Sequence, residues 1–279
     1  MKTIFTDDIT SAVRNLCIQA CTVLGNDVIH QLNFALETEE SSIGRMVLEK
    51  IIQNAEIAAT EHIPLCQDTG MAVVFLEIGQ DVHIVGDLLP NAINEGVRQG
   101  YKDGFLRKST LDPITRVNFG DNTPAVIHTE IVAGEKFKIT LAPKGFGSEN
   151  MSRVMMFPPS AGIEGAKDFI VQRVLESGGN PCPPVVVGVG LGGTFEKSAL
   201  IAKKALLRPL GSQNPDPVLA SLEAELLGRI NSSGIGPMGL GGKTTALAVH
   251  INSYPTHIAS LPVAVNIQCH SCRHAEVEL

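Results

Sequence analysis

The sequence of 279 residues has no Trp and only two Tyr, which removes the side chains that several binding surfaces depend on. Surfaces that stack nucleic-acid bases or grip proline-rich peptides rely on aromatic rings, so we expect neither class here. Runs of Lys or Arg are also missing, and the formal net charge is -7. Because phosphate backbones are bound by basic surfaces, the sequence predicts no nucleic-acid partner.

Long apolar runs and targeting signals are missing as well. No apolar run reaches the roughly 18 residues that a membrane span needs. The first ten residues, MKTIFTDDIT, lack the basic and apolar regions of a signal peptide. We therefore expect no membrane partner and a cytoplasmic location. Six cysteines in such a chain favour metal-binding or catalytic thiols over a disulfide framework.

Hydrophobic periodicity predicts a helical first quarter followed by mixed elements. Residues 123–141 alternate apolar and polar side chains around Gly134, as an antiparallel hairpin would. The best candidate for a boundary is the NPDP stretch at residues 214–217, but it is only a loop. We therefore predict one α+β domain over residues 1–279, with a helical N-terminal part and a mixed or antiparallel sheet packed by helices. The expected helices cover residues 8–32, 38–60, 88–101, 160–175, 195–207 and 217–230, and the other expected strands cover 71–79, 82–85, 183–190 and 259–268.

Two glycine-rich segments resemble nucleotide-binding loops. Residues 188–193 contain the spacing G-x-G-x-x-G between a predicted strand and a predicted helix. A dinucleotide fold also needs a second parallel strand ending in an acidic residue about 20 positions later. That region reads LLRPLGSQNPDP, so a tight strand-to-helix turn is the simpler interpretation. Residues 241–245 (GGKTT) resemble a phosphate-binding loop, but Pro237 stands where that loop needs glycine; its backbone amides could still face an anion.

Three cysteines lie in loops marked by proline and glycine. Cys66, Cys182 and Cys269 each stand at the end of a predicted element, where functional groups concentrate. Three thiolates that are far apart in sequence suit a convergent metal site. A catalytic metal site keeps one coordination position open, and a cubane cluster held by three cysteines leaves one iron free to act as a Lewis acid.

The other three cysteines are interpreted differently. Cys17 and Cys21 lie four residues apart on a predicted helix with an apolar face, so we expect them to pack in the core. Cys272 forms a C-x-x-C pair with Cys269, next to two histidines. A zinc site or a redox pair therefore stays an alternative at that end of the chain.

Several motifs resemble the class I, iron-sulfur-dependent fumarate hydratases and L-tartrate dehydratases. The main ones are PLCQDTG at residues 64–70, NPCPPVVVGVG at 180–190 and HIASLPVAVNIQCHSCRH at 257–274. LRKS, GDNTPA and KGFGSEN agree in order and spacing, so the likeness covers nearly the whole chain. The resemblance implies the α subunit of a hydro-lyase that needs a β subunit and has a homodimeric α core. Its expected reaction is the reversible hydration of fumarate to L-malate, with L-tartrate dehydration as the alternative.

The same resemblance implies the cofactor and the cluster ligands. Cys66, Cys182 and Cys269 are expected to ligate a 4Fe-4S cluster whose fourth iron takes the substrate hydroxyl and a carboxylate oxygen. Cys272 falls outside that set, although its closeness to Cys269 leaves the choice between the two open. A non-catalytic cluster carrier or oxygen sensor would use the same thiols without a substrate.

The resemblance further implies residues that act on a dicarboxylate substrate. Asp68 and His257 are the acid-base candidates on this chain and are expected to pair as a proton relay, while the base that takes the C3 proton is expected on the β subunit. Gln67, Arg107 and Gly145 are expected to bind the substrate, with Arg107 gripping a carboxylate through its planar guanidinium. Each polar residue also has a plainer interpretation. Asp68 suits an Asx turn, His257 a capped loop, and Arg107 an exposed surface.

Overall fold

The computed structural model describes residues 1–279 and divides the chain into two compact units. Unit 1 comprises Met1–Leu24, Asn54–Gly145 and Arg273–Leu279, and unit 2 comprises Gly25–Gln53 and Phe146–Cys272. No junction between the units falls at residues 214–217, the boundary that the sequence suggested. None of the helices combines the length and the apolarity that a membrane span needs.

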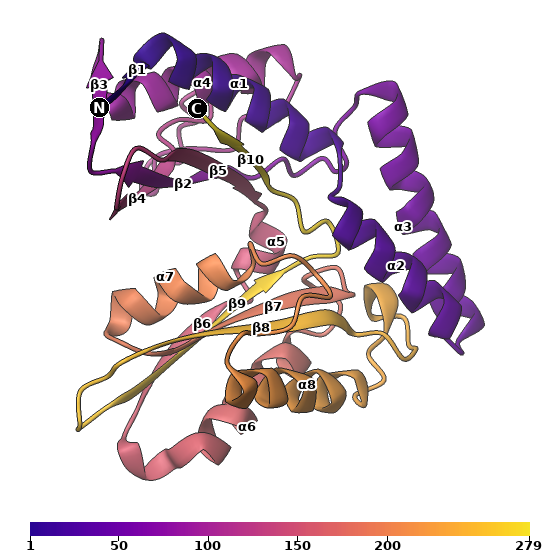
Figure 1. Ribbon diagram of the computed structural model, residues 1–279. Helices are drawn as coiled ribbons and strands as arrows, with labels where there is room; N and C mark the ends of the chain where they lie inside the picture. The colour runs from indigo at the N-terminus through magenta and orange to yellow at the C-terminus, as the bar shows by residue number, and fades with distance from the viewer. The chain divides into compact units, whose positions relative to one another are not determined.

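Unit 1 contains a four-stranded mixed sheet in the order β10-β5-β2-β4 (Figure 1). The hairpin predicted over residues 123–141 is wrong, because β2 lies between its two strands. β2 pairs in parallel with β4 and antiparallel with β5. Its sequence MAVVFLEIG is almost entirely buried, and a strand this apolar is best accommodated between two neighbours. The bounds are β2 (Met71–Gly79), β4 (Val126–Val132), β5 (Phe137–Lys144) and β10 (Ala275–Glu278).

Two helices and a short parallel pair of strands complete unit 1. Gly100 of α4 allows close packing on α1, because a Cβ there would lie 2.7 Å from the Cβ of Cys17. The helix predicted over residues 8–32 is in fact two helices, since Val23 adopts an extended backbone and Gly25 caps the next helix. The bounds are β1 (Lys2–Phe5), which pairs with β3 (Val82–Val85), and α1 (Thr6–Thr22) and α4 (Leu89–Asp103).

Unit 2 contains a second mixed sheet, in the order β6-β9-β7-β8. The central strand β7 pairs in parallel with β8 and antiparallel with β9. Helices α6 and α8 cover one face of the sheet and α7 covers the other (Figure 1). The bounds are β6 (Arg153–Phe157), β7 (Val185–Gly192), β8 (Ala246–Tyr254), β9 (Leu261–Gln268), α5 (Phe146–Glu149), η1 (Pro159–Ala161), α6 (Gly162–Ser177), α7 (Phe195–Ala205), α8 (Pro217–Asn231) and η2 (Pro237–Gly239).

Helix α2 (Asn26–Thr38) belongs to unit 2, and α3 (Ser42–Glu61) begins in unit 2 and ends in unit 1. The side chain of Ser41 accepts the Gly44 N–H at 3.1 Å and caps α3, which begins at Ser42 and not at residue 38 as predicted. Helices and mixed sheets together confirm the predicted α+β class.

The G-x-G-x-x-G spacing of β7 serves helix packing. A Cβ added to Gly188 would collide with the carbonyl oxygen of Ala202, and one added to Gly190 would collide with that of Ser198. Both carbonyls belong to α7, so the missing side chains let this helix lie close against the strand. Gly192 and Gly193 then make the turn into α7 with φ of 84° and 76°. The structure therefore supports the interpretation as a strand-to-helix turn.

Candidate functional site

The six cysteines fall into two groups by exposure. Cys17, Cys21 and Cys272 are buried, whereas Cys66, Cys182 and Cys269 are partly exposed. Burial raises the pKa of Cys21 to about 11 and that of Cys17 well above its ordinary value. The predicted core packing of these two helical cysteines is thus confirmed. Since the thiolate is the form that binds metals, the partly exposed group is the better supply of ligands.

In unit 1, the loop that carries Cys66 folds back on itself. The Cys66 thiol donates to the Gln67 side-chain carbonyl at 3.1 Å, and the Asp68 N–H points at Cys66 Sγ at 3.4 Å. Asp68 Oδ1 accepts the Gly70 N–H at 3.0 Å, which is the Asx turn that the sequence suggests. Gly70 has a φ of +74°, and a Cβ there would lie within 2.8 Å of the Lys144 backbone. Only glycine fits this turn.

Two buried side chains fix the carbonyls of the Cys66 loop. The Tyr101 hydroxyl, fully buried in α4, lies 2.8 Å from Thr69 O and 3.0 Å from Gly70 O. Asn122, also fully buried, donates to Gly70 O at 3.1 Å and accepts the backbone N–H of Ser109 at 2.7 Å. Asn122 therefore ties the PLCQDTG, LRKS and GDNTPA motifs together.

Arg107 and Gly145 lie beside this loop. Thr69 Oγ1 donates to the carbonyl of Arg107 at 3.1 Å, and the Arg107 residue is exposed. A Cβ added to Gly145 would lie 3.2 Å from Asp68 Oδ2. The buried Arg273 donates to the carbonyl of Asp68. Unit 1 thus places four predicted site residues near Cys66, namely Gln67, Asp68, Arg107 and Gly145. Arg273, which was not predicted from the sequence, lies beside them.

In unit 2, the topology brings the Cys182 and Cys269 loops to one edge of the sheet. Cys182 precedes β7, Cys269 follows β9, and these two strands are antiparallel neighbours. His270 joins the loops, because its N–H donates to Cys182 O at 3.4 Å and its Nδ1 lies 3.0 Å from the same oxygen. Cys182 itself adopts a φ of +56°, uncommon for a residue with a side chain.

Cys272 is oriented away from this pair of loops. Its thiol lies 3.6 Å from the carbonyl of Leu206, and the residue is 4% exposed. The Cys269 thiol instead lies 3.8 Å from the carbonyl of Ser271. Neither unit gathers three His, Cys, Asp or Glu side chains into a metal site by itself. The zinc alternative at the C-x-x-C pair therefore gains no support from the geometry.

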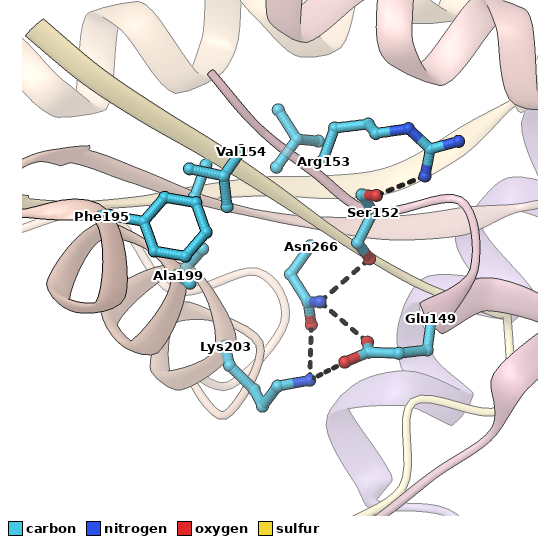
Figure 2. A pocket seen from close by; sticks show the side chains of 11 residues that line it. Glu149, Ser152, Arg153, Val154, Phe195, Ala199, Lys203 and Asn266 are labelled. Atoms are coloured by element: carbon cyan, nitrogen blue, oxygen red, sulfur yellow. Dashed lines mark hydrogen bonds and ion pairs between the residues drawn. The ribbon is translucent and has the colours of Figure 1, made fainter. Parts of the chain in front are cut away.

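A polar network next to a cavity of about 360 Å³ fixes the end of β9 (Figure 2). Lys203 of α7 forms an ion pair with Glu149 of the KGFGSEN motif. Asn266 donates to Glu149 at 2.8 Å and to Ser152 Oγ at 2.9 Å. Asn266 is three residues from Cys269, so the network holds the strand that delivers this cysteine. The KGFGSEN motif is recognisable in the sequence, but the sequence alone does not assign Glu149 a role.

His257 lies far from the cysteine loops of its own unit. It occupies the exposed connection between β8 and β9, where its Nδ1 accepts the Ala259 N–H at 3.2 Å. Cys269 follows the other end of β9, and eight residues of strand span roughly 25 Å. The local geometry is that of a capped loop histidine. Its pairing with Asp68, a residue of unit 1, stays a prediction.

The comparisons with known proteins agree along nearly the whole chain. The family model for fumarate hydratase (Fumerase) matches residues 10–278. A Methanocaldococcus jannaschii protein provisionally named L(+)-tartrate dehydratase subunit alpha is 44% identical over 273 residues, 96% of each chain. The L(+)-tartrate dehydratase subunit alpha of Escherichia coli strain K12 is 32% identical over 265 residues, covering 94% of this chain and 87% of its own. The chain therefore belongs to the fumarate hydratase (Fumerase) family and is a hydro-lyase.

Proposed function

We propose that this chain is the catalytic α subunit of an iron-sulfur hydro-lyase that, with a β subunit, reversibly hydrates fumarate to L-malate. The observation that carries the proposal is the division of the cysteines, with three partly exposed in ordered loops and three buried. The family model of fumarate hydratase, which matches residues 10–278, supports this reaction. The need for a β subunit is supported by the names of the relatives, which are subunits alpha.

We assign Cys66, Cys182 and Cys269 as the ligands of a 4Fe-4S cluster. The donor set fits the group, because these three thiols are partly exposed and cysteine thiolates are the usual ligands of such clusters. Cys272 is excluded from the set, since it is buried against Leu206. When bound, the cluster supplies an iron with an open position that acts as a Lewis acid on the substrate hydroxyl.

The protein's own residues bind the dicarboxylate and move protons. Arg107 provides a planar pair of donors for one carboxylate, and Gln67 provides a side-chain amide beside Cys66. In the dehydration direction, Asp68 donates a proton to the departing hydroxyl, so that water leaves from C2. The C3 proton goes to a base that we expect on the β subunit, and the double bond forms between C2 and C3.

We also propose that two α subunits pair, and that the partner copy contributes His257 to the site. Within unit 2, His257 lies at the opposite end of β9 from Cys269, so its own chain does not bring it to the Cys182 and Cys269 loops. The loop is available for contact between copies, because Ile258 beside it is 91% exposed. Co-expression of a His257→Ala chain with an Asp68→Asn chain tests this directly. Mixed dimers regain part of the activity if His257 acts across the pair, and none if it acts within its own chain.

L(+)-tartrate is the second candidate substrate, and the names of the relatives favour it. Both substrates carry two carboxylates and a leaving hydroxyl, so the residues assigned above serve either. The assay is anaerobic α subunit with its β subunit and malate, fumarate or L(+)-tartrate in parallel. The substrate with the largest kcat/KM identifies the activity, and turnover by the α subunit alone would contradict the two-subunit proposal. The cytoplasmic location expected from the sequence also stays a prediction.

The decisive experiment is anaerobic iron and sulfide analysis, with absorption spectra, of the wild type and of single Cys→Ser variants. We expect loss of a four-iron cluster in Cys66→Ser, Cys182→Ser and Cys269→Ser, and its retention in the matched variant Cys272→Ser. A reconstituted wild-type chain without iron would overturn the proposal.

A cluster carrier or oxygen sensor would pass that experiment without being an enzyme. Gln67→Ala, Asp68→Asn and Arg107→Ala distinguish the two, because a hydro-lyase loses turnover in these variants while its cluster spectrum persists. Unchanged turnover in all three variants would contradict the assigned roles.

A further inference from the structure

Glu39, at the junction of α2 and α3, is a buried carboxylate that binds backbone amides. It is 3% exposed. Its Oε1 accepts the N–H groups of Glu40 and Ser41 at 3.0 Å. Both oxygens also accept the Lys243 N–H, at 2.9 and 3.0 Å, and Oε2 accepts the Thr244 N–H at 3.0 Å. Burial acts to raise the pKa of Glu39, but these amides lower it below its ordinary value.

The backbone amides of the GGKTT segment therefore already bind an anion, the carboxylate of Glu39. Its amides face a carboxylate that the chain itself supplies from about 200 residues away in sequence. A Cβ added to Gly242 would lie 2.9 Å from Glu39 Oε1, so the carboxylate fills the space beside the loop. This arrangement explains the resemblance to a phosphate-binding loop without a bound nucleotide.

The loop that Glu39 holds has little conformational preference of its own. Five glycines between residues 234 and 242 have positive φ, and Met238 has a φ of 53°. Glycine loses more conformational entropy on ordering than any other residue, so this loop depends on tertiary contacts. Three of these contacts join the loop to the Glu39 carboxylate, through the backbone N–H groups of Lys243 and Thr244.

The far side of the same loop contacts the segment that carries Cys182. The Met238 N–H donates to Pro183 O at 2.7 Å, directly after the cysteine. A Cβ added to Gly239 would lie 2.6 Å from the Cα of Gly179, so the two backbones are in contact. At the base of the loop, the Val185 N–H donates to Thr245 O at 2.8 Å. The glycine loop is thus clamped at one side by Glu39 and supports the Cys182 segment at the other.

We propose that Glu39 is a positioning residue for Cys182, acting through the loop of residues 234–245. This inference rests on the proposed function, in which Cys182 is a cluster ligand. Outer residues that orient a ligand commonly change metal retention without touching the metal. Glu39 would act in this way, by ordering a glycine-rich support.

The test compares Glu39→Gln with Glu40→Gln in the full chain. Glu40 is the matched control, because its side chain is 85% exposed and its only ion pair is a 3.5 Å contact with Lys243 Nζ. Amide hydrogen exchange and iodoacetamide labelling of Cys182 are measured on the apo chain, and iron loss to a chelator on the loaded chain. In Glu39→Gln we expect faster exchange at Lys243, Thr244 and Met238, and labelling and iron loss faster by about tenfold. Glu40→Gln should match the wild type.

Unchanged exchange and unchanged Cys182 labelling in a folded Glu39→Gln chain would overturn the inference. If Glu39→Gln does not fold, hydrogen exchange in the wild type tests the inference instead. We expect slow exchange at the Lys243 and Thr244 amides. Exchange at the rate of an open loop would show that Glu39 does not hold this loop. If the wild type binds no iron, the proposed function is wrong. The role of Glu39 is still tested in that case, because hydrogen exchange and Cys182 labelling are measured on the apo chain.

Discussion

The Cys66 loop of unit 1 and the Cys182 loop of unit 2 are held in different ways. The first is fixed by several side chains, among them Tyr101, Asn122 and Arg273, which bind its carbonyl oxygens. The second is fixed mainly by backbone contacts, and the His270 side chain also faces the Cys182 carbonyl. Removing a side chain that contacts the loop directly should therefore loosen the first loop more than the second.

The two loops should therefore also differ in how well they tolerate the loss of a side chain. Removing a buried side chain leaves partners without hydrogen bonds in a place that water does not reach. Removing the His270 side chain leaves the backbone contacts of the Cys182 loop with Gly179 and Met238 in place. The Cys66 loop thus depends on a few buried side chains, whereas the Cys182 loop depends on backbone contacts with a glycine-rich support.

Cysteine labelling should give the largest contrast, and it examines both loops at once. In the reduced apo chain, we expect iodoacetamide to modify Cys66, Cys182 and Cys269 readily, because they are partly exposed. The three buried cysteines should react slower by at least about a thousandfold, since their labelling requires opening of the fold. Peptide mass spectrometry against time measures all six rates. Equal rates at Cys269 and Cys272 would contradict the different orientations of these two neighbours.

Local pattern was enough to predict many elements and failed where pairing is decided over long distances. β2 and β3 have the predicted bounds, because their apolar tracts are short and bounded by turns. Alternation over residues 123–141 correctly indicated strands, but it carries no information about β2 inserting between them. The terminal strands β1 and β10 were not predicted, since each is only four residues long and depends on a distant partner.

The candidate site shows the same limit. The loops of Cys66, Cys182 and Cys269 could be singled out from proline and glycine beside each cysteine. The roles of Asn122, Arg273 and His270 could not, because each depends on a contact with a loop distant in sequence. GDNTPA was the available signal for Asn122, and only the fold shows which backbone groups it binds.

Asn122→Ala should give the largest loss of stability in unit 1. The substitution leaves the amides of Ser109 and Thr110 without their side-chain partner and removes one of the two buried donors to the carbonyl of Gly70. We expect the free energy of unfolding to fall by about 3 kcal/mol. His270→Ala, the corresponding change in unit 2, should cost about 1 kcal/mol, because the backbone N–H bond to Cys182 remains. Urea unfolding of both variants measures the difference, with the exposed Asn118→Ala as control. A larger loss in His270→Ala would reverse the comparison.

Tyr101→Phe removes a single hydroxyl from the same support. The hydroxyl faces two carbonyl oxygens in a fully buried position, and the ring remains to fill the core. We expect the free energy of unfolding to fall by about 1.5 kcal/mol. Tyr254→Phe is the matched control, because Tyr254 is 51% exposed. Equal stability of the two variants would show that Tyr101 does not fix the Thr69 and Gly70 carbonyls.

Unit 2 differs from unit 1 in a further way, through a buried histidine that makes its stability depend on pH. His250 is 2% exposed, and burial, together with the charge of Arg208, lowers its pKa to about 4. Between that value and the ordinary pKa near 6.5, the unfolded chain binds a proton that the folded chain excludes, so stability falls as pH falls through this window. Lowering the pH from 7.5 to 5.5 should reduce the free energy of unfolding by about 1 kcal/mol through this group.

Urea unfolding at both pH values should show that loss in the wild type and in the control His83→Asn, which replaces an exposed histidine, but not in His250→Asn. A pH dependence that persists unchanged in His250→Asn would assign the effect to other groups and remove this distinction between the two units.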